Sequence, residues 1–215
     1  MSFRLISAKL TMLLLGIFAA ALSPAMAQTT ATAPLPAAPD LENILVLDLS
    51  TGGRVTIQMY PIDAPAHVER IKTLTRQGFY NNVVFHRVID GFMAQTGDPQ
   101  GTGQGGSALP DLKAEFNRIP HLRGTVSMAR TNEPDTANSQ FFICFQPRFN
   151  LDNKYTVFGR VTSGMQFVDA IARGEPPVNP STVIQASIAA DNVPPPAFTS
   201  APAEAPIIVD QLNAG

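Results

Sequence analysis

The sequence predicts a mainly β domain, folded as a closed or nearly closed β structure whose ends are covered by two helices. Three observations support this prediction. Many short apolar runs alternate as strands with one buried face do, only two segments have helical spacing, and turn-forming residues separate the runs. Periodicity alone leaves a barrel and a sandwich equally open.

A β-hairpin is the first predicted element, and it begins near Asn43. Apolar side chains occupy every second position over residues 45–49 and again over residues 55–59. Thr51-Gly52-Gly53 lies between the two runs and supplies the turn. This arrangement is typical of two neighbouring antiparallel strands.

A helix is predicted after the hairpin, with Asp63 as its N-cap and Pro65 in its first turn. Its apolar face consists of Val68, Ile71 and Leu74. A second, shorter helix is predicted over residues 164–172. The remaining strands are predicted over residues 83–88, 92–96, 125–129, 140–145, 155–161 and 182–189.

Residues 1–27 are interpreted as a secretory signal peptide. Arg4 and Lys9 precede an apolar run over residues 10–22, and Ala25-Met26-Ala27 is a small-residue pattern that predicts cleavage after Ala27. The apolar run is shorter than the roughly 20 residues of a membrane-spanning helix, so we expect no stable membrane insertion after cleavage. This leader predicts an exported protein of the periplasm.

The rest of the chain is divided by composition. Residues 28–42 are rich in Ala, Thr and Pro and predict a disordered spacer, residues 43–191 form the predicted domain, and residues 192–215 form a tail rich in Pro and Ala. Whether part of this tail docks on the domain is left open. The length of the domain suits one full core, and we expect a monomer.

Composition also narrows the function. Removing the leader removes two of the 15 Lys and Arg residues, which leaves a net charge of −4 against 17 Asp and Glu. A mildly acidic chain has no electrostatic footprint for nucleic acid, so no nucleic-acid partner is expected. Cys144, the only cysteine, stands among Phe and Ile residues and is interpreted as an inert core residue.

Two features of the sequence, a glycine-rich motif and the three histidines, could suggest a nucleotide site or a metal site, but their context supports neither. Residues 101–106 read Gly-Thr-Gly-Gln-Gly-Gly, but neither a strand before them nor a helix after them completes a dinucleotide site, so a tightly turned loop is expected. The three histidines have no metal-ligand spacing, and no metal or other cofactor is expected. His86 is interpreted as a structural histidine, hydrogen-bonded beneath the site, rather than as a general base.

The residues that carry chemistry lie in the middle of the chain. Residues 85–98 read Phe-His-Arg-Val-Ile-Asp-Gly-Phe-Met-Ala-Gln-Thr-Gly-Asp, followed later by Ser127-Met128-Ala129-Arg130 and by residues 138–143, Asn-Ser-Gln-Phe-Phe-Ile. Strand alternation places Met93 and Gln95 on one face, and it likewise pairs Gln140 with Phe142. Taken singly, each aromatic residue would be assigned to the core.

Together these segments resemble the signature of the cyclophilin family of peptidyl-prolyl cis-trans isomerases. The resemblance continues through Leu151-Asp152 and Val157-Phe158-Gly159 and covers most of residues 43–173. It implies a closed antiparallel eight-stranded β-barrel capped by two α-helices, with the site on the outer surface of the barrel. The strand count comes from the resemblance and not from periodicity.

The resemblance also implies roles for individual residues. Arg87 matches the catalytic arginine of the family, and Gln95 is expected to orient it. The implied substrate-binding residues, which form the proline pocket and the strand beside it, are Phe92, Met93, Ala129, Arg130, Gln140, Phe142, Leu151 and Tyr155. This chain departs from many relatives in having Tyr155 where they carry histidine, and Asn150 where they carry tryptophan.

The implied function is isomerisation of X–Pro bonds in unfolded or partly folded exported polypeptides, which assists their folding. This reaction needs no nucleophile and no cofactor. The alternative is a non-catalytic peptide-binding or assembly module on the same fold. The presence of Arg87 and Gln95 favours the enzyme.

Overall fold

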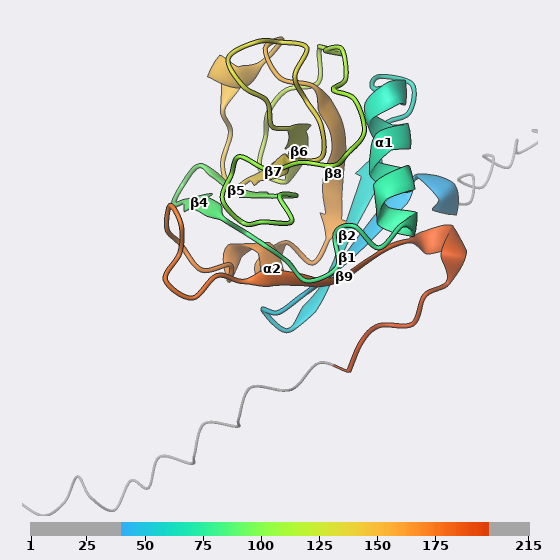
Figure 1. The fold of residues 1–215 in the computed structure, drawn as a ribbon, viewed down its shortest axis with the longest axis vertical. Coiled ribbons are helices and arrows are strands. Elements are labelled where there is room, and N and C mark those ends of the chain that lie inside the picture. The colour runs from blue at the N-terminus through green and yellow to red at the C-terminus, as the bar shows by residue number, and fades with distance from the viewer. Residues whose placement is uncertain (1–39, 198–215) are drawn as a thin grey trace, which may run out of the picture. The chain divides into compact units, whose positions relative to one another are not determined.

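The computed structural model describes residues 40–197 as one curled antiparallel sheet of nine strands with two α-helices (Figure 1). The order of the strands is β3-β9-β1-β2-β8-β6-β7-β5-β4. The strands are β1 (Ile44–Leu49), β2 (Gly53–Met59), β3 (Val83–Val84), β4 (Arg87–Ile89), β5 (Met93–Thr96), β6 (Thr125–Met128), β7 (Phe141–Cys144), β8 (Val157–Ser163) and β9 (Thr182–Ile188). The helices are α1 (Pro65–Arg76) and α2 (Met165–Asp169).

The two edge strands of this sheet are halves of one extended segment. β3 pairs with β9, β4 pairs with β5, and only Phe85 and His86 separate them along the chain. The backbone N–H of Phe85 donates to Ser181 O (2.9 Å), and the hydroxyl of Thr96 donates to Val84 O (2.9 Å). The predicted strand over residues 83–88 therefore contributes β3 at one edge of the sheet and most of β4 at the other. Counted as one strand, it gives the eight strands of the expected barrel.

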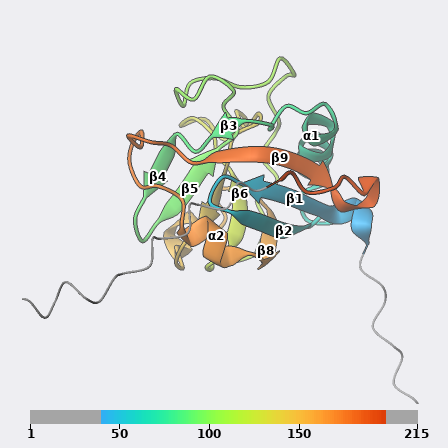
Figure 2. The same cartoon turned by 90° about the horizontal axis from the view of Figure 1, so that it is seen from below.

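The predicted hairpin is confirmed. Leu45 and Leu47 of β1 lie opposite Ile57 and Val55 of β2, and all four side chains are fully buried. With Phe141 and Phe158 they belong to one large apolar core inside the curled sheet. Helix α1 packs beside β9 and α2 beside β2, so the helices cover different parts of the sheet (Figure 2).

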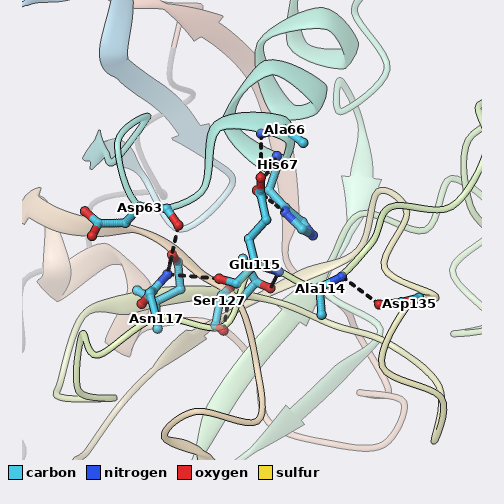
Figure 3. A network of polar contacts seen from close by, with 10 residues as sticks. Asp63, Ala66, His67, Ala114, Glu115, Asn117, Ser127 and Asp135 are labelled. Carbon is cyan, nitrogen blue, oxygen red and sulfur yellow. Dashed lines mark hydrogen bonds and ion pairs between the residues drawn. The ribbon is translucent and has the colours of Figure 1, made fainter.

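The predicted cap of α1 is wrong. Ala64 occupies the N-cap position and makes no side-chain cap. The carboxylate of Glu115 instead accepts hydrogen bonds from the backbone N–H groups of Ala66 (3.1 Å) and His67 (3.2 Å), as Figure 3 shows. Since an acceptor brought in by folding satisfies these donors, the sequence next to the helix cannot reveal the cap.

Replacing Glu115 with alanine is expected to lower the free energy of unfolding by about 1–2 kcal/mol, because the first turn of α1 loses its acceptor. Urea unfolding followed by circular dichroism measures the change. Asp63→Ala is the matched control and should stay within about 0.5 kcal/mol of the parent. Equal losses in both variants would restore Asp63 as the cap.

Residues 40–42, which the sequence assigned to the disordered spacer, have a defined structure. Leu41–Asn43 form a 3-10 turn, and the Asp40 carboxylate accepts hydrogen bonds from Glu42 N and Asn43 Nδ2. The proposed signal peptide and most of the spacer and tail lie outside the described residues. Over residues 40–197, no helix has both the length and the hydropathy needed to cross a bilayer.

Candidate active site

Three of the predicted site residues form a row across neighbouring strands. Arg87 of β4 lies directly opposite Gln95 of β5, and Gln95 lies opposite Phe142 of β7. Residues directly opposite one another point to the same face of a sheet. This face is the outer one, because their neighbours Val88, Ala94 and others belong to the core inside the sheet.

A pocket of about 100 Å³ opens on this outer face. It is lined by Arg87, Phe92, Met93, Gln95, Ala129, Arg130, Phe142, Leu151 and Tyr155. These nine residues come from four separate stretches of chain, and every one of them was expected at the site from the sequence. The pocket therefore places the guanidinium of Arg87 beside several apolar and aromatic side chains.

The walls of the pocket are firmly packed. The rings of Phe142 and Tyr155 meet edge to face with centroids 5.8 Å apart, and the ring of His121 stacks on the other side of Phe142 at 6.2 Å. Met93 and Leu151 join Phe142 and Cys144 in a small cluster beneath the pocket. The interpretation of Cys144 as a core residue is confirmed, and burial raises the pKa of its thiol to about 12.

A chain of amide groups supports the arginine. Arg87 Nη1 lies 3.5 Å from Gln95 Oε1, and Gln95 Nε2 donates to Gln140 Oε1 at 2.8 Å. Gln140 Nε2 in turn donates to the carbonyl oxygens of Gly103 (3.1 Å) and Gly105 (2.8 Å). Each amide has its donor and acceptor ends used, so the orientation of Gln95 toward Arg87 is fixed.

The glycine-rich segment 101–106 is the tight loop that the sequence predicts. It wraps around the buried carboxylate of Asp98, which accepts backbone hydrogen bonds from Thr102, Gly103 and Gly105. A Cβ on Gly105 would lie 2.1 Å from Asp98 Oδ1, so only glycine fits there. The loop forms one wall of a second groove of about 590 Å³, which shares Gln95, Ala129 and Arg130 with the pocket.

Arg130 lines both cavities, but its guanidinium is held by the protein. It donates to the carbonyl oxygens of Lys154 (2.8 Å) and Thr131 (2.8 Å) and lies 4.5 Å from the ring centroid of Tyr155. Arg148 supports the opposite wall in the same way, with Nη2 on Gly91 O and its guanidinium 5.1 Å from the ring centroid of Phe92. Two arginines thus fix the aromatic walls.

Sequence reasoning missed Arg148 and one more residue, Glu175. The carboxylate of Glu175 accepts a hydrogen bond from Arg87 Nε at 2.8 Å. These residues are 88 positions apart, and Glu175 belongs to the loop between α2 and β9. The sequence could indicate only that an arginine beside apolar side chains needs an acidic partner, and it could not indicate which acidic residue this is.

The expectation for His86 is partly wrong. The side chain is buried as expected, but neither ring nitrogen has a hydrogen-bond partner among the described residues. The amide of the neighbouring Gln140 is already used by Gln95 and the glycine-rich loop. Burial lowers the pKa of His86 below its usual 6.5, and the charge of Asp98 and the nearby amide of Gln140 only partly oppose this.

We expect the free energy of unfolding to fall as the pH drops below 6.5. Since the pKa of His86 is lower in the folded state, the unfolded chain takes up the proton first, and the stabilisation is complete only above pH 6.5. One such group costs at most about 1.4 kcal/mol per pH unit. Urea unfolding at about pH 7.5 and about pH 5.5 measures the loss, which should be smaller in His86→Phe. Identical losses would contradict this assignment.

No group of three or more His, Cys, Asp or Glu side chains that could hold a metal ion occurs within residues 40–197. What the site offers is a cationic donor beside a small apolar pocket. The family model described as cyclophilin type peptidyl-prolyl cis-trans isomerase matches residues 46–189. The chain belongs to this cyclophilin family.

Relatives of this cyclophilin occur in bacteria and fungi. A probable peptidyl-prolyl cis-trans isomerase of Brucella suis is 48% identical over 170 residues, which cover 72% of this chain and 86% of the relative. A peptidyl-prolyl cis-trans isomerase-like 1 protein of Aspergillus fumigatus is 46% identical over 128 residues, covering 58% and 78% of the two chains. Every residue that lines the pocket falls within the stretch that the family model matches.

Solved cyclophilin structures share the fold. A cyclophilin from Hirschia baltica superposes with a TM-score of 0.66 at 29% identity, covering 72% of this chain and 77% of the other. A cyclophilin from Cryptosporidium parvum, determined in the presence of the dipeptide Ala-Pro, gives a TM-score of 0.63 at 26% identity and covers 67% and 98%. The mainly β barrel with two helices is therefore the cyclophilin fold.

Proposed function

We propose that Arg87 catalyses the isomerisation while the proline ring of the substrate occupies the pocket walled by Phe92, Met93, Phe142 and Leu151. The observation that carries this proposal is the position of Arg87, which lines the same small pocket as these apolar side chains. A pocket of this size suits one compact ring and not an extended side chain.

The chemistry of the reaction explains why such a pair of features is needed. Conjugation of the peptide bond opposes rotation with a barrier of about 18–20 kcal/mol. In the twisted transition state the conjugation is lost, and the nitrogen of proline carries a localised lone pair. A donor that reaches this nitrogen stabilises the twisted state more than either planar isomer, and that difference is what accelerates a reaction.

Arg87 is suited to be this donor. Its guanidinium stays protonated and offers several N–H groups in one plane. Nε is used by Glu175, and Nη1 faces Gln95, while Nη2 has no hydrogen-bond partner within the described part of the chain. We assign the unoccupied donor to the substrate and the orienting contact to Gln95.

The groove that adjoins the pocket suits the rest of the peptide. It runs past Ala129 and Gln140 and is bordered by backbone of the glycine-rich loop, so an extended chain can be recognised through its own amide groups. Unfolded or partly folded polypeptides that contain proline are the proposed substrates. The Cryptosporidium relative was determined in the presence of Ala-Pro, which supports this substrate class.

A protease-coupled assay on a proline test peptide decides whether the purified protein accelerates isomerisation. We expect a rate that rises linearly with enzyme concentration and exceeds the uncatalysed exchange, which takes tens to hundreds of seconds. A protein that binds the peptide without changing the rate would be the non-catalytic module. Peptide with alanine in place of proline serves as the binding control.

We further propose that the protein works in the periplasm as a monomer, after cleavage behind Ala27, where it assists the folding of exported proteins. The support is the charged and then apolar leader with its small-residue cleavage pattern. Fractionation of bacterial cells that produce the full chain, followed by determination of the N-terminal residue, tests this. Protein retained in the cytoplasm with Met1 intact would refute export.

A further inference from the structure

Glu175 is the one acidic side chain that contacts the proposed catalytic arginine in the described part of the chain. Its Oε2 atom lies 2.8 Å from Arg87 Nε, and it does not line the pocket. Both side chains are about half exposed, at 42% for Arg87 and 51% for Glu175. Ion pairs this exposed contribute little to folding stability, so stability does not explain the contact.

The backbone of the loop holds Glu175 in place next to β4. Gly174, the preceding residue, exchanges both backbone hydrogen bonds with Val88, the residue after Arg87 (2.8 and 2.9 Å). Arg173 adds an ion pair with Asp90 (3.2 Å) and lies 4.2 Å from the ring centroid of Phe145. The carboxylate therefore reaches Arg87 from an anchored main chain and not from a freely moving loop.

The contact orients the guanidinium without consuming the donors that face the substrate. Glu175 accepts a hydrogen bond from Nε, and Gln95 faces Nη1. The plane of the guanidinium is therefore held by two different residues, one in the loop beside β4 and one in β5. An arginine side chain has several rotatable bonds, and a donor that is already aimed when the bond twists needs no reorganisation. A single contact would leave rotation about the remaining axis free.

We propose that Glu175 is a positioning residue for the isomerase reaction, which sets the plane of the Arg87 guanidinium from the loop between α2 and β9. This inference rests on the proposed catalytic role of Arg87. The geometry predicts that loss of Glu175 affects turnover and leaves binding of the peptide in the pocket largely unchanged, because Glu175 does not itself line the pocket.

Steady-state kinetics of Glu175→Ala and Glu175→Gln on a proline peptide test the proposal. We expect kcat to fall about three- to ten-fold in Glu175→Ala, with KM within about two-fold of the parent, equivalent to roughly 0.7–1.4 kcal/mol of barrier. Glu175→Gln keeps an oxygen acceptor and should recover at least half of the parental kcat. Asp169→Ala, which breaks the exposed pair with Arg123, is the matched control and should match the parent.

Two further measurements separate positioning from a general structural effect. In an Arg87→Ala background, Glu175→Ala should cause no additional loss. In nitrogen-15 spectra, the Nε–H signal of Arg87, assigned by its absence in Arg87→Ala, should broaden or vanish in Glu175→Ala. Parental kcat in Glu175→Ala, beside an impaired Arg87→Ala, would overturn this inference alone. Parental kcat in Arg87→Ala would overturn the proposed function as well.

Discussion

Replacing Arg87 with alanine is expected to lower kcat/KM for a proline test peptide at least about ten-fold, or ~1.4 kcal/mol of barrier. The variant loses the only cationic group of the pocket whose guanidinium is not bound to carbonyl oxygens of the protein. The pocket itself remains, so peptide binding should change less than turnover. The protease-coupled assay measures both.

The fold should survive this substitution. Arg87 is 42% exposed and its ion pair with Glu175 is about as exposed, so unfolding free energy should change by less than about 1 kcal/mol. Arg76 of α1 is the matched control, because it is 41% exposed and also pairs with a carboxylate, but lies away from the pocket. Arg76→Ala should retain parental kinetics. An Arg87→Ala protein with parental kcat/KM would remove the mechanism.

Replacing Phe142 with alanine should have the second large effect, because it removes one aromatic wall of the pocket. Phe142 is 5% exposed, and its ring packs against those of Tyr155 and His121. Loss of an aromatic wall removes about 1.5–3 kcal/mol of apolar contact with the proline ring, so kcat/KM should fall about ten- to a hundred-fold. KM should rise because the peptide binds less tightly, and kcat should fall because the proline ring is held less firmly while the bond rotates.

This substitution also affects folding, and the design must allow for it. Truncation of a buried phenylalanine typically costs about 3–5 kcal/mol, so unfolding is measured alongside the kinetics. Phe142→Leu keeps part of the wall and should give an intermediate loss of activity in a more stable protein. Phe79→Ala is the control, because Phe79 packs against the main core and lines neither the pocket nor the adjoining groove. Unchanged kinetics in both Phe142 variants would place the proline elsewhere.

The strands were predictable because their signal is local. Alternation of apolar residues located β1 and β2, and short apolar runs between turn-forming residues located β5 to β9 within a few positions. The same argument could not show that residues 83–88 divide between two sheet edges. That division depends on Val183 and Gln95, which pair with opposite ends of the segment and lie far apart in the sequence.

The site was predictable to the extent that it lies in the motifs. Arg87, Gln95 and Phe142 come together as expected because strand register alone sets them in a row. Glu115 and Glu175 were not predictable, since each reaches its partner from a loop whose path is fixed only in the folded protein. The expected hydrogen bond of His86 failed for a related reason, because other groups take the amide of Gln140.

The segment that joins β3 to β4 has a consequence for the proposed action on unfolded chains. An open sheet presents a row of unpaired N–H and C=O groups, onto which a non-native polypeptide can add as a further strand and aggregate. In residues 40–197 both terminal strands of the sheet are short and belong to one stretch of chain, and Val84 O is bonded to Thr96. Within the described residues, the sheet therefore exposes only short edges, which makes β-addition of a proposed client chain less favourable than it would be on a long open edge.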